Sequence, residues 1–329
     1  MAELVLGVAS SHSPMVTMDG EDWLEWGLRD HQHPMLYTRE GRNVSYEEQL
    51  ALVGVAMAAQ ATLEKCHVGA GRVDVAVTRL QTAITDADLD VIIVIGDDQD
   101  EHLLAHNLPA FLVYWGDTIP NSGIEDFDEL PSLTQRFLPG WRERDGERSY
   151  DVDSQLARHI IEQAFSNDFD VASSNELPQV DEGMGHAFGF PLRRLIMGDT
   201  KIVPVMVNTY NPPTQPRASR CVAFGEMLRD AIASFPGDAR VGVIASGGLS
   251  HFLVLEDLDR EVIAAFERQD FDALTAIPET TYVSGTSEIK NWIVAGSICR
   301  DLSFELVDYV PGYRTPAATG TGLGFGLWH

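Results

Sequence analysis

The sequence predicts an α/β protein, a single domain over residues 1–329 with a central mixed, largely parallel sheet that helices cover on both faces. Short apolar segments alternate along the chain with helical segments of roughly 10 to 15 residues, which is typical of this class. The apolar segments also lack the polar alternation of a half-exposed strand, as expected for strands buried on both faces. A length of 329 residues gives ample material for one large core.

The N-terminal half predicts two strands and two helices. Residues 4–9 and 90–95 are short and almost entirely apolar, and each runs into a polar loop. Ser45 and Glu48 form a capping box, and apolar residues recur at helical spacing behind it. The same spacing predicts a second helix over residues 73–84.

The C-terminal half continues this alternation and contains no internal repeat. Helices are predicted where apolar residues recur at helical spacing, and strands where the apolar residues run together. The segment SGTSE is expected to cap the last helix. The expected helices are 153–165, 191–197, 219–233, 257–268 and 286–299, and the expected strands are 169–173, 201–208, 240–245 and 304–309.

Two segments show no clear period and are expected to be insertions. Residues 116–150 are rich in Asp, Glu, Pro and Gly, and we expect an excursion over the surface. Residues 19–43 are expected to be irregular and carry Trp23, Trp26 and His33. This second segment either supplies side chains to a pocket or covers a subunit interface.

The charge and cysteine content exclude several classes of function. With 50 acidic and 23 basic residues, the formal net charge is −27, which disfavours binding to nucleic-acid phosphates and to anionic membranes. No apolar run approaches the roughly 20 residues of a membrane span, and the first residues lack the basic region of a signal peptide. Three widely spaced cysteines suggest neither a disulfide framework nor a zinc site, so we expect a cytoplasmic protein.

Three polar loops follow predicted strands, namely SSHSP, GDDQDEH and SGGLSH. In open α/β sheets the ligand lies beyond the carboxyl ends of strands, so these loops are expected to form one site. His12 in the first loop is a candidate for metal binding or acid–base work, against a capping or core role. His251 in the third loop is a candidate general base, against a role in local packing. The sequence around it lacks a serine nucleophile elbow.

Two further residues could join these loops. His186 lies in the glycine-rich segment DEGMGHAFGFP, which indicates either close approach to a ligand or only a glycine-rich loop. Glu288 is expected in the first turn of a helix, where it either binds a metal or interacts with the helix dipole. Two histidines and one carboxylate form the ligand set of non-haem Fe(II) oxygenases, although spacing alone does not identify such a site.

The ordered motifs resemble those of the class III extradiol ring-cleavage dioxygenases, the family of the protocatechuate 4,5-dioxygenase catalytic subunit. The resemblance implies that His12 and Glu288 bind Fe(II), that His251 is the catalytic base and that His186 is a second catalytic histidine. It covers most of the chain. The matching segments are GVASSHSP, DVIIVIGDDQ, HAFGFPLRRLIMG, IVPVMVNTYNPP, SGGLSHFL, SGTSEIKNWIVAG and PAATGTGLGF.

The chain departs from the family at one metal ligand. The family usually has Asp-His after the second strand, whereas the aligned residue here is Gln99, which we expect to be the third ligand. An amide oxygen can bind a hard cation, but imidazole suits Fe(II) better. His102, Asp97, Asp98 and Glu101 could instead supply this ligand. If the chain binds no iron, it would be a non-catalytic or repurposed subunit that pairs with an active dioxygenase.

The resemblance implies an Fe(II)-dependent extradiol dioxygenase that opens the ring of a catechol-type substrate with O2. Carboxylated or methoxylated catechols such as protocatechuate, gallate or 3-O-methylgallate are the expected substrates, and a homo-oligomer is expected. His251 would remove a phenolic proton, and His186 would assist proton transfer. Ser13, Thr321 and Arg314 are the expected substrate contacts.

Overall fold

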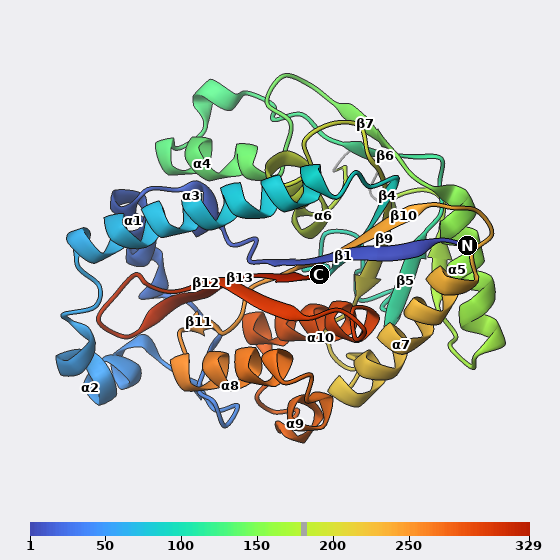
Figure 1. Cartoon of the computed structure of the whole chain (residues 1–329). Coiled ribbons are helices and arrows are strands. Elements are labelled where there is room, and N and C mark those ends of the chain that lie inside the picture. Colours follow the sequence, from blue (N-terminus) through green and yellow to red (C-terminus); the bar gives the residue numbers. More distant parts are fainter. Residues whose placement is uncertain (179–182) are drawn as a thin grey trace.

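One central sheet organises the computed structural model, which describes residues 1–178 and 183–329 (Figure 1). Within these residues nine strands form the sheet in the order β11-β13-β1-β10-β4-β9-β5-β8, with β12 paired to β13. The strands are β1 (Glu3–Ser10), β4 (Val91–Gly96), β5 (Phe111–Tyr114), β8 (Ala172–Ser174), β9 (Lys201–Val207), β10 (Arg240–Ser246), β11 (His251–Leu253), β12 (Phe304–Tyr313) and β13 (Thr319–Trp328).

The centre of the sheet is parallel and its flanks are mixed. The four adjacent strands β1, β10, β4 and β9 all run the same way. In contrast, β13 is antiparallel to β1, and β5 is antiparallel to β9. The predicted fold class, an α/β protein with a mixed and largely parallel central sheet, is confirmed.

Helices cover both faces of the sheet, as Figure 1 shows. In β4, Val91 and Ile93 pack into the core formed with α5, α7 and α10, whereas Ile92 and Val94 pack into the core formed with α3 and α6. Because successive side chains point to opposite faces, burial on both sides produces the continuous apolar run in the sequence. The helices are α1 (Gly20–Asp30), α2 (Tyr46–Met57), α3 (Leu63–Asp86), α4 (Ser132–Phe137), α5 (Ser154–Ser166), α6 (His186–Arg194), α7 (Ala218–Ser234), α8 (Glu256–Glu267), α9 (Phe271–Ala276) and α10 (Ile289–Ile298).

The carboxyl ends of three parallel strands lie at one edge of the sheet. Ser10 at the end of β1 pairs with Ser246 at the end of β10, and Ile95 of β4 pairs with Ala245. The three polar loops begin at Ser10, Gly96 and Ser246, the last residues of these strands. The register of the sheet therefore brings them to the same place, as expected from the sequence.

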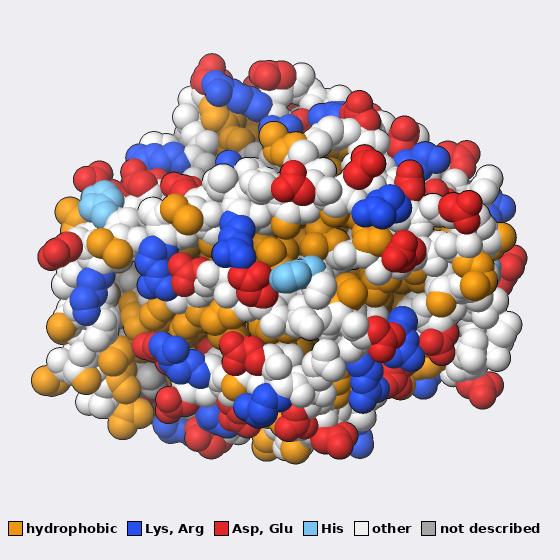
Figure 2. All heavy atoms as spheres, in the orientation of Figure 1, with side chains coloured by type: hydrophobic (Ala, Val, Ile, Leu, Met, Phe, Trp, Pro, Cys, Tyr) orange, Lys and Arg blue, Asp and Glu red, His pale blue; other side chains and the backbone are white. Residues whose placement is uncertain are grey.

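The surface carries charge of both signs. Figure 2 shows acidic and basic side chains interspersed over one face, with no continuous basic patch on that face. Among the helices of the described residues, none is both long and apolar enough to span a bilayer.

The expectation of an irregular segment over residues 19–43 is wrong for its first part. Residues Gly20–Asp30 form α1, whose first turn is fixed by a capping box between Asp19 and Asp22. Trp23 on this helix is 1% exposed and belongs to the core. The capping signal is present in the sequence, but the glycines and tryptophans of the helix weaken its apparent helical pattern.

Residues 116–150 also contain regular structure. The strands β6 (Thr118–Asn121) and β7 (Arg148–Asp151) pair with each other, and α4 lies between them in the chain. The strands β2 (Leu36–Tyr37) and β3 (Asn43–Val44) form a second small ladder. These elements are too short to produce a recognisable period in the sequence.

The expected last strand at 304–309 is too short, and a further strand follows it. β12 extends to Tyr313, and all ten residues of β13 are buried. Glycine occupies every second position from Gly320 to Gly326. A Cβ at Gly322 would meet the Asp259 carboxylate, and one at Gly326 would meet the Phe304 ring. Close packing requires these glycines, and they disguise the strand in the sequence.

The helix expected at 191–197 begins earlier and ends earlier. α6 spans His186–Arg194, and Pro191 lies inside it instead of at its first turn. The strand expected at 169–173 is the short β8 at Ala172–Ser174. The shift matters because it places His186 at the start of a helix, at the edge of the site.

Candidate metal centre and active-site pocket

Three buried side chains converge at the carboxyl edge of the sheet. His12 follows β1, Asp97 follows β4, and Glu288 ends the short 3-10 helix that leads into α10. They are 4%, 0% and 1% exposed, and one ligand atom from each lies within 4.8 Å of the others. Chain segments separated by more than 270 residues thus supply one group of potential metal ligands.

The surroundings of His12 fit a metal ligand. Its Nδ1 lies 3.0 Å from the Ser246 hydroxyl, which fixes the orientation of the ring. Its Nε2 is buried and has no hydrogen-bond partner of good geometry among the described residues, although it lies 3.2 Å from a Glu288 oxygen. A buried ring nitrogen left without a hydrogen bond, beside carboxylate oxygens, is what a cation would satisfy.

The two carboxylates place negative charge in a buried position. Burial raises the pKa of Asp97 to about 6, and the charge of Glu288 adds to this effect. Burial would also raise the pKa of Glu288, but the charges of His251 and His12 outweigh it and hold that pKa well below the ordinary value. A divalent cation would balance this charge, and one imidazole with two carboxylates is a donor set that Fe(II) and other first-row metals accept.

Gln99 lies beside this group and contacts both carboxylates. Its Nε2 donates to Glu288 at 2.9 Å and to Asp97 at 3.2 Å. In this arrangement the Gln99 amide group is a hydrogen-bond donor to the carboxylates. The role of Gln99 as a metal ligand stays a prediction. Of the Asp, Glu and His residues in the GDDQDEH loop, Asp97 is the one within the group of three.

His102 and Asp98, in the same loop, have partners outside the group of three. His102 Nε2 lies 2.7 Å from the carbonyl oxygen of Gly183. Asp98 accepts hydrogen bonds from the backbone N–H groups of Glu101, His102 and Leu103, so it shapes the loop.

His251 is the first residue of β11 and contacts Glu288, one of the three potential metal ligands. Its Nε2 lies 2.9 Å from Glu288, and its Nδ1 lies 2.9 Å from the carbonyl oxygen of Leu249. Burial would lower the pKa of His251, but the charge and hydrogen bond of Glu288 outweigh it and raise the pKa. The side chain also lines the pocket, so it can exchange a proton with a molecule there.

His186 forms a pair with Glu101, a residue expected from the sequence only as a possible metal ligand. The Nδ1 atom of His186 lies 2.9 Å from one Glu101 oxygen, and its backbone N–H donates to the other at 2.8 Å. Burial disfavours the charged form of both residues. Their mutual attraction and hydrogen bonds outweigh this effect, raising the pKa of His186 to about 10 and lowering the pKa of Glu101 to about 2. The two residues are 85 positions apart, and no sequence pattern links them.

His12, Glu288, His251 and His186 all line one pocket of 320 Å³. This volume is close to the lower end of the range of about 300 to 1,000 Å³ for small-molecule sites. The predicted substrate contacts Ser13, Thr321 and Arg314 all line it, and the hydroxyls of Ser13 and Thr321 lie 3.3 Å apart. Aromatic side chains complete its walls. The lining residues are His12, Ser13, Pro14, Trp26, Gln99, Glu101, Phe137, Trp141, His186, His251, Phe252, Glu288, Arg314 and Thr321.

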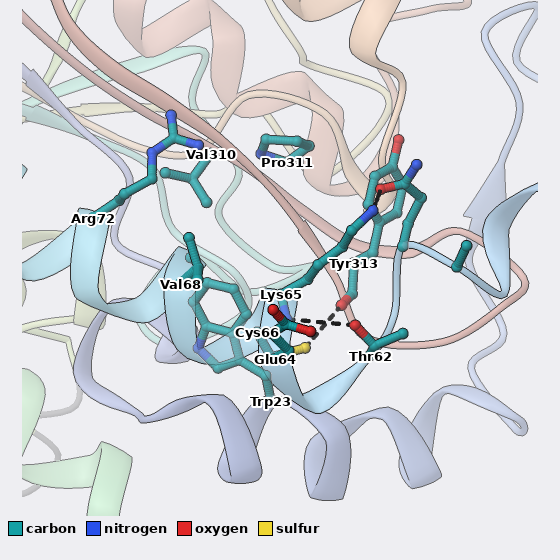
Figure 3. A pocket seen from close by; sticks show the side chains of 13 residues that line it. Trp23, Thr62, Glu64, Lys65, Cys66, Val68, Arg72, Val310, Pro311 and Tyr313 are labelled. Carbon is teal, nitrogen blue, oxygen red and sulfur yellow. Dashed lines mark hydrogen bonds between the residues drawn. The ribbon is translucent and has the colours of Figure 1, made fainter.

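A larger cavity of 480 Å³ lies elsewhere, between α3 and β12 (Figure 3). Its two basic side chains already have partners, since Arg72 bonds Asp308 at 3.0 Å and Lys65 bonds Gln60 at 2.6 Å. Burial raises the pKa of the Cys66 thiol to about 11, which keeps it protonated at neutral pH. This cavity lacks converging chemical groups, and the smaller pocket is the candidate site.

The predicted family is confirmed by comparison with known proteins. A family model described as the catalytic LigB subunit of aromatic ring-opening dioxygenase matches residues 64–324. A gallate dioxygenase from Pseudomonas putida is 35% identical over 100 residues, which cover 29% of this chain and 28% of that protein.

A second relative is a 2,3-dihydroxyphenylpropionate/2,3-dihydroxicinnamic acid 1,2-dioxygenase from Dechloromonas aromatica. It is 30% identical over 181 residues, which cover 54% of this chain and 48% of that protein. The chain therefore matches less than half the length of each of these curated relatives. Because the family model spans well over half of the chain, this protein belongs to the family of catalytic LigB subunits of aromatic ring-opening dioxygenases.

Proposed function

We propose that this protein is an extradiol dioxygenase that opens the ring of a catechol-type substrate with O2, using Fe(II) held by His12, Asp97 and Glu288. The observation that carries the proposal is the buried ligand group at a pocket that also contains His251 and His186. When bound, Fe(II) would supply the redox chemistry that couples the oxidation of a catechol to the reduction of O2.

The proposed ligand set replaces the expected Gln99 by Asp97. A carboxylate oxygen of Asp97 is within reach of the other two ligands, whereas the Gln99 amide donates to carboxylate oxygens of Asp97 and Glu288. In this proposal Gln99 orients both carboxylates. Hydrogen bonds of this kind to ligands tune metal affinity without contact to the metal.

His251 is proposed as the general base. Its Nδ1 is held by the carbonyl oxygen of Leu249, so Nε2, which lies 2.9 Å from Glu288, is the nitrogen that would take up a proton. A phenolic proton of a catechol that lies beside Glu288 would transfer to this nitrogen. The imidazolium that forms would be stabilised by the Glu288 carboxylate.

His186 is proposed to hold and donate a proton beside His12. The two imidazole rings have centroids 4.6 Å apart in an edge-on arrangement. Glu101 fixes the His186 ring through Nδ1, which leaves Nε2 for a substrate oxygen. Glu101 is thus a positioning residue for His186.

The proposal can be tested by loading the protein with Fe(II) without oxygen and measuring its metal content. Oxygen uptake is then measured with a panel of catechols. We expect about one Fe(II) per chain and uptake with at least one catechol. His12→Ala should abolish both, whereas the matched control His102→Ala, a buried histidine outside the ligand group, should keep its iron. A wild-type protein that retains no iron and consumes no oxygen would favour a non-catalytic subunit instead.

A further inference from the structure

We infer that the pocket selects catechols with an apolar or aromatic substituent over catechols with a carboxylate substituent. The inference rests on the proposed function and names its substrate class. It comes from two features of the pocket, an aromatic wall and an arginine whose charge is already balanced. Both features involve α1, which precedes the residues matched by the family model.

The aromatic wall consists of Trp26, Phe137 and Trp141, all of which line the pocket. The rings of Trp26 and Phe137 meet edge to face with centroids 4.8 Å apart, and Phe137 stacks on Trp141 at 5.4 Å. Trp141 in turn lies edge to face with His186, at 6.2 Å. A chain of ring contacts therefore runs from His186, the proposed proton donor, through Trp141 and Phe137 to Trp26. A substituent that extends past His186 would meet aromatic surface.

Arg314 is the cation that a carboxylate substituent would require. It is the only Lys or Arg among the described residues that line this pocket. Its Nε and Nη2 donate to the two oxygens of Asp30 at 2.9 and 3.1 Å. Arg314 is 4% exposed and Asp30 is 1% exposed, so water hardly screens the pair. The third nitrogen, Nη1, faces the Met15 sulfur at 3.7 Å, which is a weak acceptor.

This arrangement disfavours an anionic substituent. The positive charge of Arg314 is balanced by Asp30 before any substrate enters. A substrate carboxylate would lose its hydration without gaining an unbalanced cation, which is unfavourable. An aryl or alkyl group loses no such hydration and gains contact with the aromatic wall.

The wall comes from the two segments that the sequence predicts to be insertions. Trp26 and Asp30 belong to α1, whereas Phe137 ends α4 and Trp141 follows shortly after it. α1 packs closely against the hairpin of β12 and β13, which contains Arg314. The approach is so close that a Cβ at Gly27 would lie 2.8 Å from the Arg314 carbonyl oxygen. The selecting surface is therefore built into the packing of the folded protein.

Two matched substrate pairs test the inference in the Fe(II)-loaded protein. The pairs are 4-phenylcatechol with protocatechuate and 3-phenylcatechol with 2,3-dihydroxybenzoate, so that within each pair only the substituent differs. We expect kcat/KM to favour the phenyl compound by about tenfold or more in at least one pair. Equal or higher values for the carboxylated compound in both pairs would overturn the inference.

Two sets of variants assign the preference to its source. Asp30→Asn frees the Arg314 charge and should shift the ratio by about tenfold toward the carboxylated compound. The matched control Glu21→Gln, an exposed acidic residue on the same helix outside the pocket, should leave the ratio unchanged. Replacing Trp26 and Phe137 by leucine should lower kcat/KM for the phenyl compound alone. If Asp30→Asn folds and the ratio does not move, Arg314 has no part in selection.

Anaerobic binding by equilibrium dialysis separates this inference from the proposed function and also serves if a variant is too unstable for kinetics. Tighter binding of the phenyl compounds without oxygen uptake would support the inference while the proposed function fails. Oxygen uptake with tighter binding of the carboxylated compounds would support the proposed function while the inference fails.

Discussion

Tyr309 holds the loop that carries His251, and its removal should have a cost that depends on pH. The Tyr309 hydroxyl donates to Asp259 at 2.7 Å, and Asp259 also accepts hydrogen bonds from the backbone and hydroxyl of Ser250. Asp259 is 0% exposed, so each donor matters to its ionised form. The substitution Tyr309→Phe removes one donor and little volume.

The size of the effect follows from this geometry. Burial raises the pKa of Asp259 to about 6 from an ordinary value of 3.8, against the lowering effect of its hydrogen bonds with Tyr309 and Ser250. Because the pKa is raised in the folded state, this group stabilises folding most below pH 3.8, and that stabilisation is lost as pH rises through about 6. From below pH 3.8 to above pH 6, the contribution of this group to the free energy of unfolding falls by about 3 kcal/mol.

Tyr309→Phe should therefore lower the free energy of unfolding by about 1.5–3 kcal/mol near pH 7.5, where Asp259 is ionised, because the lost hydrogen bond is to a charged group. Near pH 5 most of Asp259 is protonated, and the cost should fall to about 0.5–1.5 kcal/mol. Chemical denaturation of both proteins at the two pH values measures the difference.

Tyr313→Phe is the matched control for this experiment. Tyr313 donates to Glu256 at 2.8 Å, but the Glu256 side chain is 34% exposed, so water can replace the lost bond. A smaller cost is expected there. An equal cost of Tyr309→Phe at both pH values, or no cost near pH 7.5, would refute the reasoning.

The remaining predictions concern the metal group and the base. Asp97→Asn should lose iron after anaerobic loading, as should His12→Ala; full iron content in either would remove that residue from the ligand set. Gln99→Ala should bind iron about 10- to 100-fold more weakly, because a residue that only orients the ligands is lost, and complete loss of iron would instead make Gln99 a ligand. His251→Gln should keep its iron and its substrate binding but turn over about 10² to 10⁴-fold more slowly, with a defect that shrinks as pH rises and the catechol loses its proton unaided. Wild-type turnover at neutral pH in that variant would exclude His251 as the base.

The elements that the sequence predicts best are those whose burial is complete. β4 and β10 carry apolar residues on both faces, so their runs stand out in any local window. The meeting of the three loops follows from strand direction alone, since parallel strands end at one edge. The positions of His12 and His251 could therefore be predicted without knowledge of distant contacts.

What the sequence does not reveal depends on partners far along the chain. The pair between Asp30 and Arg314 joins residues 284 positions apart, and nothing near either residue indicates the other. The choice between Asp97 and its neighbours in the GDDQDEH loop depends on the direction of each side chain, which the fold of the whole loop decides. Such side-chain pairings are tertiary facts, and local patterns do not encode them.

The position of β13 has a consequence for the synthesis of the protein. This strand, residues 319–328, pairs with β12 along one edge and with β1 and β11 along the other. During translation the outer edge of β1 therefore stays uncovered until β13, about 300 residues further along the chain, has been made. An uncovered apolar strand edge is a site for wrong pairing between chains. The nascent protein thus exposes this edge until β13 arrives, and slow or interrupted synthesis of β13 would prolong that exposure.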